Sequence, residues 1–145
     1  MESISELISR ARAAQAEFEK TATQESVDAI VKAIAKTVYE NAEPLAKLAA
    51  EESGMGLYED KINKNKGKAR IIWSFLKDKK SVGVISRDDR TCITEVARPM
   101  GVVAAITPCT NPIVTPMCNA MYAIKGRNAI IIAPHPRAKK CARVV

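Results

Sequence analysis

The sequence is poor in aromatic residues and glycine, and it has no long apolar run. Only 4% of its 145 residues are aromatic, and it contains 6 Gly and 7 Pro. This composition excludes collagen-like and low-complexity chains, while 47% hydrophobic residues suffice for a buried core. The longest apolar runs, Gly101 to Ile106 and Ala129 to Pro134, are far shorter than the ~18 residues of a membrane span. We therefore expect a soluble protein with no membrane partner.

Features of secretion and of metal binding are missing as well. Met1 to Glu6 carries acids and hydroxyls, whereas a signal peptide begins with Lys or Arg before a long apolar stretch, so a cytoplasmic protein is expected. The single His135 cannot complete a zinc set, and the cysteines are too widely spaced for C-x-x-C pairs. No metal site is expected, and the thiols should be reduced. The four cysteines are Cys92, Cys109, Cys118 and Cys141.

Acidic residues are outnumbered by basic ones, 16 to 23, which gives a net charge of +7. Such a balance points toward an anionic partner. Both signs alternate in residues 61–70 and 87–90, however, as is typical of solvated helix faces. No aromatic residues are interleaved with the basic ones, and no known nucleic-acid recognition motif accompanies them. Nucleic acid is therefore not an expected partner.

Residues 1–77 have the apolar spacing of helices, with apolar side chains recurring every three or four positions. Ser3 and Glu6 form a capping box, and Thr23 is a suitable N-cap. Pro44 suits the first residue of a helix, and Gly54 suits a C-terminal stop. We expect four helices, from Ile4 through Phe18, from Thr23 until Asn41, from Pro44 to Gly54, and from about Tyr58 to Phe75.

After Asp78 the apolar pattern changes from the helical to the strand period. Ser81 to Ser86 and Thr91 to Arg98 alternate, which predicts a hairpin whose turn is Arg87 to Arg90. Two further segments, Met100 to Ile106 and Ala129 to Ala133, are nearly continuous apolar runs. Such runs are typical of parallel strands covered on both faces.

These elements predict an α/β fold. The helical layer (1–77) is followed by a hairpin arm (78–98) and by residues 99–145, the start of a Rossmann-like parallel sheet. This last part is a β-α-β unit with a helix from about Thr115 to Lys125, and a further helix begins at Pro136. Two such strands without a third would leave an apolar edge, so we expect the chain to be the front of a larger protein.

Two loops at the carboxyl ends of the apolar strands form the candidate site, because α/β sheets bind their ligands there. In the first, Thr107-Pro108-Cys109-Thr110-Asn111-Pro112, two prolines flank a small polar stretch and hold Asn111 rigidly. A rigid carboxamide can donate a hydrogen bond to a developing oxyanion. In the alternative interpretation, Asn111 caps the following helix.

The second loop runs from Ala133 to Lys139. Pro136 would occupy the first helical turn, so that unpaired amides, the helix dipole, Arg137 and Lys139 face the same place. This arrangement suits a phosphate or a ribose. In the alternative interpretation, His135 is only an N-terminal cap and the basic residues are solvated.

Three segments, taken in order, carry a resemblance to a known family. They are EESGMGLYEDK at residues 51–61, TPCTNP at 107–112 and KGRNAIIIAPHPRAK at 125–139. Over essentially its whole length the chain resembles the CoA-acylating branch of the aldehyde dehydrogenase superfamily. That branch includes CoA-dependent succinate-semialdehyde and sulfoacetaldehyde dehydrogenases and the aldehyde half of bifunctional aldehyde-alcohol dehydrogenases.

The resemblance implies an enzyme that oxidises an aldehyde with NAD or NADP and passes the acyl group to coenzyme A, or that runs the reverse reduction. A cysteine thiolate attacks the aldehyde, hydride leaves to the nicotinamide, and the CoA thiol resolves the thioester. Asn111 matches the family asparagine that holds the thiohemiacetal oxygen. The loop Pro134-His135-Pro136 matches the turn that receives the adenosine part of the cofactor, and we expect Thr107, Pro108 and Arg137 to contribute to cofactor binding.

The resemblance also implies that residues 1–145 are a partial NAD(P)-binding domain, and it has implications for assembly and completeness. The hairpin at 81–98 would join a neighbouring subunit in a homo-oligomer. The family nucleophile comes from a segment that none of the four cysteines matches, so we expect an N-terminal part of such an enzyme, inactive alone. Two other interpretations stay open: a non-catalytic module that binds a nucleotide or CoA, and a structural fragment that assembles without ligand affinity.

Overall fold

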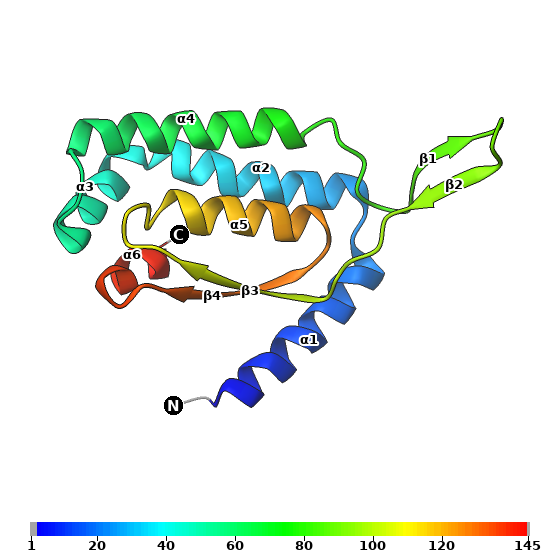
Figure 1. The fold of residues 1–145 in the computed structure, drawn as a ribbon, viewed down its shortest axis with the longest axis horizontal. Coiled ribbons are helices and arrows are strands. Elements are labelled where there is room, and N and C mark those ends of the chain that lie inside the picture. Colours follow the sequence, from blue (N-terminus) through cyan, green and yellow to red (C-terminus); the bar gives the residue numbers. More distant parts are fainter. Residues whose placement is uncertain (1–2, 145) are drawn as a thin grey trace.

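The computed structural model describes residues 3–144 and confirms the α/β fold (Figure 1). Four helices are followed by an antiparallel hairpin and then by a β-α-β unit. No helix in the described part of the chain is both long and apolar enough to pass through a membrane. The elements are α1 (Ile4–Thr21), α2 (Gln24–Glu40), α3 (Ala42–Ser53), α4 (Tyr58–Leu76), β1 (Val84–Asp88), β2 (Ile93–Val96), β3 (Val102–Thr107), α5 (Val114–Lys125), β4 (Ala129–Pro134), the 3₁₀ turn η1 (Pro136–Ala138) and α6 (Lys139–Val144).

Local capping signals set most helix ends as predicted. The Ser3 side chain forms the capping box at the start of α1, and the Thr23 side chain caps α2. Gly54 ends α3 in the left-handed conformation, with φ of 64°, where a residue with a Cβ would be strained. These ends depend on hydrogen bonds between residues close in sequence, which is why the sequence pattern identifies them.

The predicted start of α3 at Pro44 is wrong by two residues. The helix begins at Ala42, because the carbonyl of Asn41 already accepts a hydrogen bond of 3.1 Å from the amide of Leu45. Pro44 therefore lies at the third helical position. A proline is tolerated there because the first amides of a helix have no partner within the helix.

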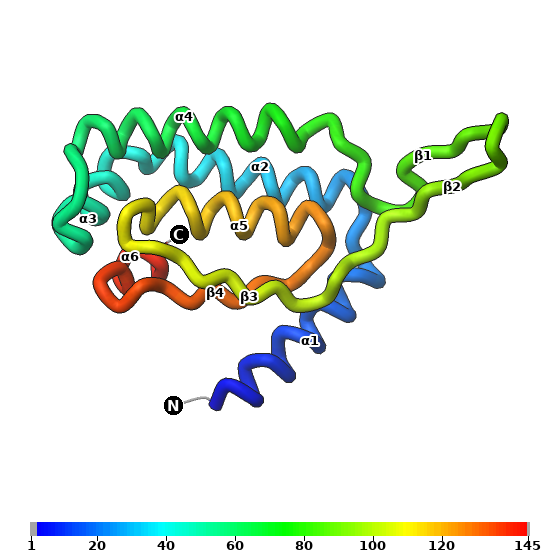
Figure 2. Tube along the Cα trace, viewed as in Figure 1, coloured from blue at the N-terminus to red at the C-terminus, as the bar shows by residue number. Residues whose placement is uncertain are grey.

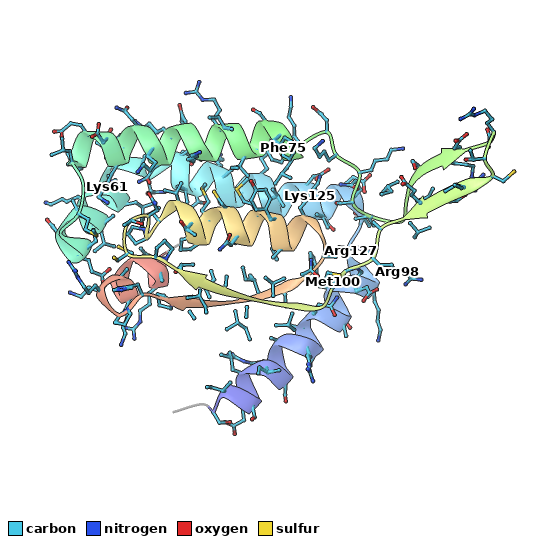
Figure 3. The ribbon with its side chains drawn as sticks, in the orientation of Figure 1. Lys61, Phe75, Arg98, Met100, Lys125 and Arg127 are labelled. Atoms are coloured by element: carbon cyan, nitrogen blue, oxygen red, sulfur yellow. The ribbon has the colours of Figure 1, made fainter. Side chains whose placement is uncertain are left out.

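Helices α2, α4 and α5 pack against one another and enclose the core (Figure 2). The five large side chains at its centre are at most 1% exposed: Val27, Val31, Ile113, Met117 and Met121. At the end of α5 the buried ammonium of Lys125, labelled in Figure 3, forms an ion pair with Asp28 of α2. Helices α2 and α4 thus hold α5 in place against the parallel strand pair.

β3 and β4 pair in parallel, from Val102 opposite Ala129 to Thr107 opposite Pro134. Helix α5 lies on one face of this pair, and α1 crosses the other face (Figure 1). The prediction that the strands are covered on both faces is wrong for the carboxyl end of β3, where Ile106 is 88% exposed. The reason is that α1 covers only part of this face.

The hairpin of β1 and β2 extends away from the helices and the parallel pair (Figure 1). Its predicted turn at Arg87 to Arg90 is wrong, because Arg87 and Asp88 belong to β1 and pair with Thr94 and Ile93. The turn lies at residues 89–92 instead. The Asp88 carboxylate accepts hydrogen bonds from the Arg90 amide at 2.9 Å and from the Thr91 hydroxyl at 2.7 Å, so it closes the turn two residues later than predicted.

Candidate active site

The two loops of the candidate site lie next to each other at one edge of the parallel pair. Thr107, the last residue of β3, is opposite Pro134, the last residue of β4. The Thr107 carbonyl accepts a hydrogen bond of 3.0 Å from the amide of His135. Thr107 is buried, whereas Pro108 and Pro136 are exposed. The fold therefore places the two sequence motifs side by side where α/β sheets bind ligands.

Asn111 is half-buried in the loop between β3 and α5, and hydrogen bonds on both sides fix its amide. Its Oδ1 accepts a hydrogen bond of 3.1 Å from Nζ of Lys64, and its Nδ2 lies 3.3 Å from the Thr110 hydroxyl. The N-cap of α5 is Ile113, and no side chain bonds to the amides there. The interpretation of Asn111 as a side-chain cap is therefore wrong. Because Lys64 occupies the oxygen and Thr110 accepts from one N–H of Nδ2, the second N–H of Nδ2 is the one left to donate to a ligand.

Helix α4 also contributes to this site, a contribution that was not predicted from the sequence. Lys61, Lys64 and Lys68 are spaced by three and four residues, so they lie along one side of the helix. Interpreting residues 61–70 as a solvated face is wrong for Lys61, which is 8% exposed (Figure 3). Burial, followed by the charge of Lys64, lowers the pKa of Lys61. This basic stripe was the available signal for a site on α4.

The second loop has its polar groups already paired within the chain. His135 caps the 3₁₀ turn, because its Nδ1 accepts a hydrogen bond from the Arg137 amide at 3.1 Å. The prediction of unpaired amides at the helix start is wrong: the amides of Lys140 and Cys141 donate to the Glu52 carboxylate at 2.7 and 2.8 Å. Glu52 reaches them from α3, so its negative charge already fills the place expected for a phosphate.

Arg137 is also held by α3. Its guanidinium donates a hydrogen bond of 2.7 Å to the carbonyl of Ser53, the last residue of that helix. The guanidinium lies 3.7 Å from the position that a Cβ on Gly54 would take. The Arg137 side chain therefore joins the second loop to the end of α3.

A half-buried carboxyl group and a buried thiol meet beneath the second loop. Burial, and then a hydrogen bond with the Glu52 carboxylate, raises the pKa of the Cys141 thiol to about 12. Burial would raise the pKa of Glu52, but hydrogen bonds from Cys141 and from the amides of Lys140 and Cys141 lower it overall. At neutral pH this pair is thus a carboxylate beside a protonated thiol, and the thiolate, which is the nucleophilic form, is rare at Cys141.

The other three thiols have different surroundings. Burial raises the pKa of Cys118 on α5, and the nearby charge of Lys68 opposes that rise. Cys109 lies in the first loop, where its Sγ is 3.6 Å from Sδ of Met55. Cys92 is exposed in the turn of the hairpin, with φ of 56°. All four cysteines are free.

Comparison with known proteins places this geometry in a family. The sequence matches the aldehyde dehydrogenase family over residues 1–145. It is 58% identical, over 138 residues, to a succinate-semialdehyde dehydrogenase (acetylating) of Clostridium kluyveri, a match that covers 95% of this chain and 30% of that protein. The chain thus spans about a third of the length of this relative.

Two solved structures resemble the fold closely. An acetylating aldehyde dehydrogenase from Geobacillus thermoglucosidasius gives a TM-score of 0.90 at 42% identity, covering 94% of this chain and 31% of the other. An engineered glycolyl-CoA reductase with bound NADP+ gives a TM-score of 0.76 at 25% identity, covering 98% and 32%. The match over the whole sequence and this agreement in fold lead to one conclusion: the chain belongs to the aldehyde dehydrogenase family.

Proposed function

We propose that this chain forms the first part of a CoA-acylating aldehyde dehydrogenase. Such an enzyme converts an aldehyde to its acyl-CoA with NAD or NADP and coenzyme A, or runs the reverse reaction. The observation that carries the proposal is the oriented amide of Asn111, held by Lys64 at the carboxyl end of β3. The 58% identity to an acetylating enzyme supports the acyl transfer to CoA.

In this function Asn111 is the catalytic residue of the chain. An aldehyde oxygen that gains negative charge during thiolate attack would accept a hydrogen bond from Nδ2 of Asn111. Lys64 is a positioning residue, because its bond to Oδ1 turns Nδ2 toward the ligand. Preorganised donors of this kind stabilise the transition state without reorganising at the moment of reaction.

The cofactor would lie against the carboxyl edge of β3 and β4, with Thr107, Pro108, Pro134, His135 and Pro136 around it. When bound there, NAD or NADP accepts the hydride. The adjacency of the two loops fits a nucleotide at this edge, and the NADP+-bound relative supports a nicotinamide cofactor. The start of α6 does not fit a phosphate, because Glu52 occupies its amides. Arg137 would then act through its bond to Ser53, which shapes the loop.

The attacking thiolate would come from outside this chain. The raised pKa values of Cys141 and Cys118 disfavour both as nucleophiles. Cys92 lies in the turn of the hairpin, which extends away from the parallel pair (Figure 1). The Cys109 thiol contacts Met55. We therefore expect the chain alone to have no dehydrogenase activity.

A chimera tests the proposal. In it, this chain replaces the matching part of the Clostridium kluyveri relative. We expect the chimera to reduce NAD or NADP in the presence of succinate semialdehyde and CoA, and the separate chain to show no turnover. A chimera that assembles like the relative but lacks turnover would contradict the proposal. Nucleotide binding without turnover would favour a binding module instead.

We also propose that the hairpin is an arm that joins subunits of a homo-oligomer. It exposes Val84, Ile93 and Val96, each 50 to 58% accessible, on strands that extend from the body (Figure 1). We expect Ile93→Lys in the chimera to lower the assembly size in sedimentation velocity, because a charge would be buried at the contact. Asp89→Lys, in the hairpin turn, is the control. Unchanged sedimentation of Ile93→Lys would contradict this role.

A further inference from the structure

A groove between α4 and α5 opens beside Asn111. It has a volume of about 440 Å³, and Lys64 and Lys68 of α4 line it opposite Cys118 and Tyr122 of α5. Asn111 lines the end where Lys64 bonds to it. The groove therefore begins at the amide proposed to hold the aldehyde oxygen and continues along α4.

The groove has an uncompensated positive charge. None of the described residues that line it is acidic. Within residues 3–144, neither Lys64 nor Lys68 takes part in a salt bridge, whereas Lys66 of the same helix pairs with Glu43 at 3.5 Å. The charge of Lys68 also acts on the Cys118 thiol across the groove. Lys68 thus faces the groove and has no anionic partner in the described chain.

The two lysines have a defined spacing. Residues four apart in a helix lie on one face, about 6 Å along the axis. Lys64 is bound to Asn111, so Lys68 lies roughly one helical turn farther from the reacting end. A short aldehyde with a carboxylate two methylenes from its carbonyl group can place its oxygen at Asn111 and its anionic end near Lys68.

We propose that this groove binds the anionic end of an ω-carboxylate or sulfonate aldehyde and that Lys68 is the residue that selects for it. The inference rests on the proposed function, because it assumes that the aldehyde reacts at Asn111. Lys68 supplies a charged donor to the substrate carboxylate, and an uncharged aldehyde gains nothing from it. Lys68 thereby acts on selectivity, and Asn111 acts on the reaction itself.

The test uses the chimera with Lys68→Met, which keeps the apolar stem and removes the charge. For succinate semialdehyde we expect kcat/KM to fall about 10-fold or more, the usual effect of losing a hydrogen bond to a charged group. For butanal, which has the same chain length and no charge, we expect no change. Lys66→Met, on the same helix but paired with Glu43, is the matched control and should change neither value. Lys68→Arg should keep the preference.

Further readouts separate this inference from the proposed function. Succinate should inhibit the unmodified chimera competitively and lose this effect in Lys68→Met, and the KM for the semialdehyde should rise with ionic strength. Equal losses for both aldehydes, or no loss for either, overturn the role of Lys68 while the proposed function stands. A chimera that assembles but is inactive toward both aldehydes overturns the proposed function, and this inference with it.

Discussion

Replacing Asn111 with alanine in the chimera should lower the rate of acylation by about 10²-fold or more, which is the usual effect of losing one oxyanion donor. The variant removes Nδ2, whose second N–H, the one that does not bond to Thr110, is the proposed donor to the substrate. Cofactor affinity should stay nearly the same, because the side chain acts on the aldehyde oxygen. Single-turnover kinetics of nicotinamide reduction, together with the Kd for NADP, measure the two effects separately.

Asn111→Asp is the matched variant. A carboxylate at this position keeps an acceptor for the Lys64 ammonium but has no N–H to donate, so it should be as slow as the alanine variant while remaining folded. A purely structural role predicts the reverse result. An alanine variant that keeps its turnover and loses mainly thermal stability would rule out Asn111 as the oxyanion donor.

Asn128→Ala should lower the free energy of unfolding of the chain by about 3 kcal/mol, measured by urea denaturation. The Asn128 Oδ1 accepts hydrogen bonds from the amides of Met100 at 2.6 Å and Gly101 at 3.0 Å. Its Nδ2 donates to the Ala123 carbonyl at 3.2 Å. Asn128 is 8% exposed, and Met100 and its chain neighbour Arg127 are labelled in Figure 3. Its loss removes the partner of the Met100 and Gly101 amides near the start of β3, whereas the Ala123 carbonyl keeps its hydrogen bond of 2.9 Å from the Asn128 amide.

A second variant probes the same amide without removing it. A Cβ on Gly126 would lie 2.7 Å from Nδ2 of Asn128, so Gly126→Ala should displace the amide and also destabilise the chain. Asn63→Ala, at an exposed position on α4, is the control and should change stability by less than about 0.5 kcal/mol. If Asn128→Ala were as mild as this control, the three hydrogen bonds would not hold the β-α-β unit together.

The sequence located the candidate site but described it incompletely. Asn111 and His135 were placed on neighbouring loops because two parallel strands joined by one helix bring their carboxyl ends to the same edge. Lys64 was missed because its partner is 47 residues away. A basic residue on a helix is most often solvated, so only the packing of α4 beside α5 showed that Lys64 orients the amide.

The sequence by itself determined the elements whose causes are local. The capping box at Ser3, the stop at Gly54 and the apolar runs of β3 and β4 all depend on hydrogen bonds or periodicity within a few residues, and the structure has them at the expected places. The order of helical layer, hairpin and β-α-β unit follows from these signals.

Only the tertiary structure decided which charges are available for function. Glu52 reaches the amides of Lys140 and Cys141 across 88 and 89 residues and closes the start of α6. Lys68, in contrast, faces a groove lined by no acidic residue among those described. The physical reason is that a charge acts over the few ångströms set by packing, and its distance along the chain does not matter. The sequence shows that a group is charged, and the fold determines whether that charge is already neutralised.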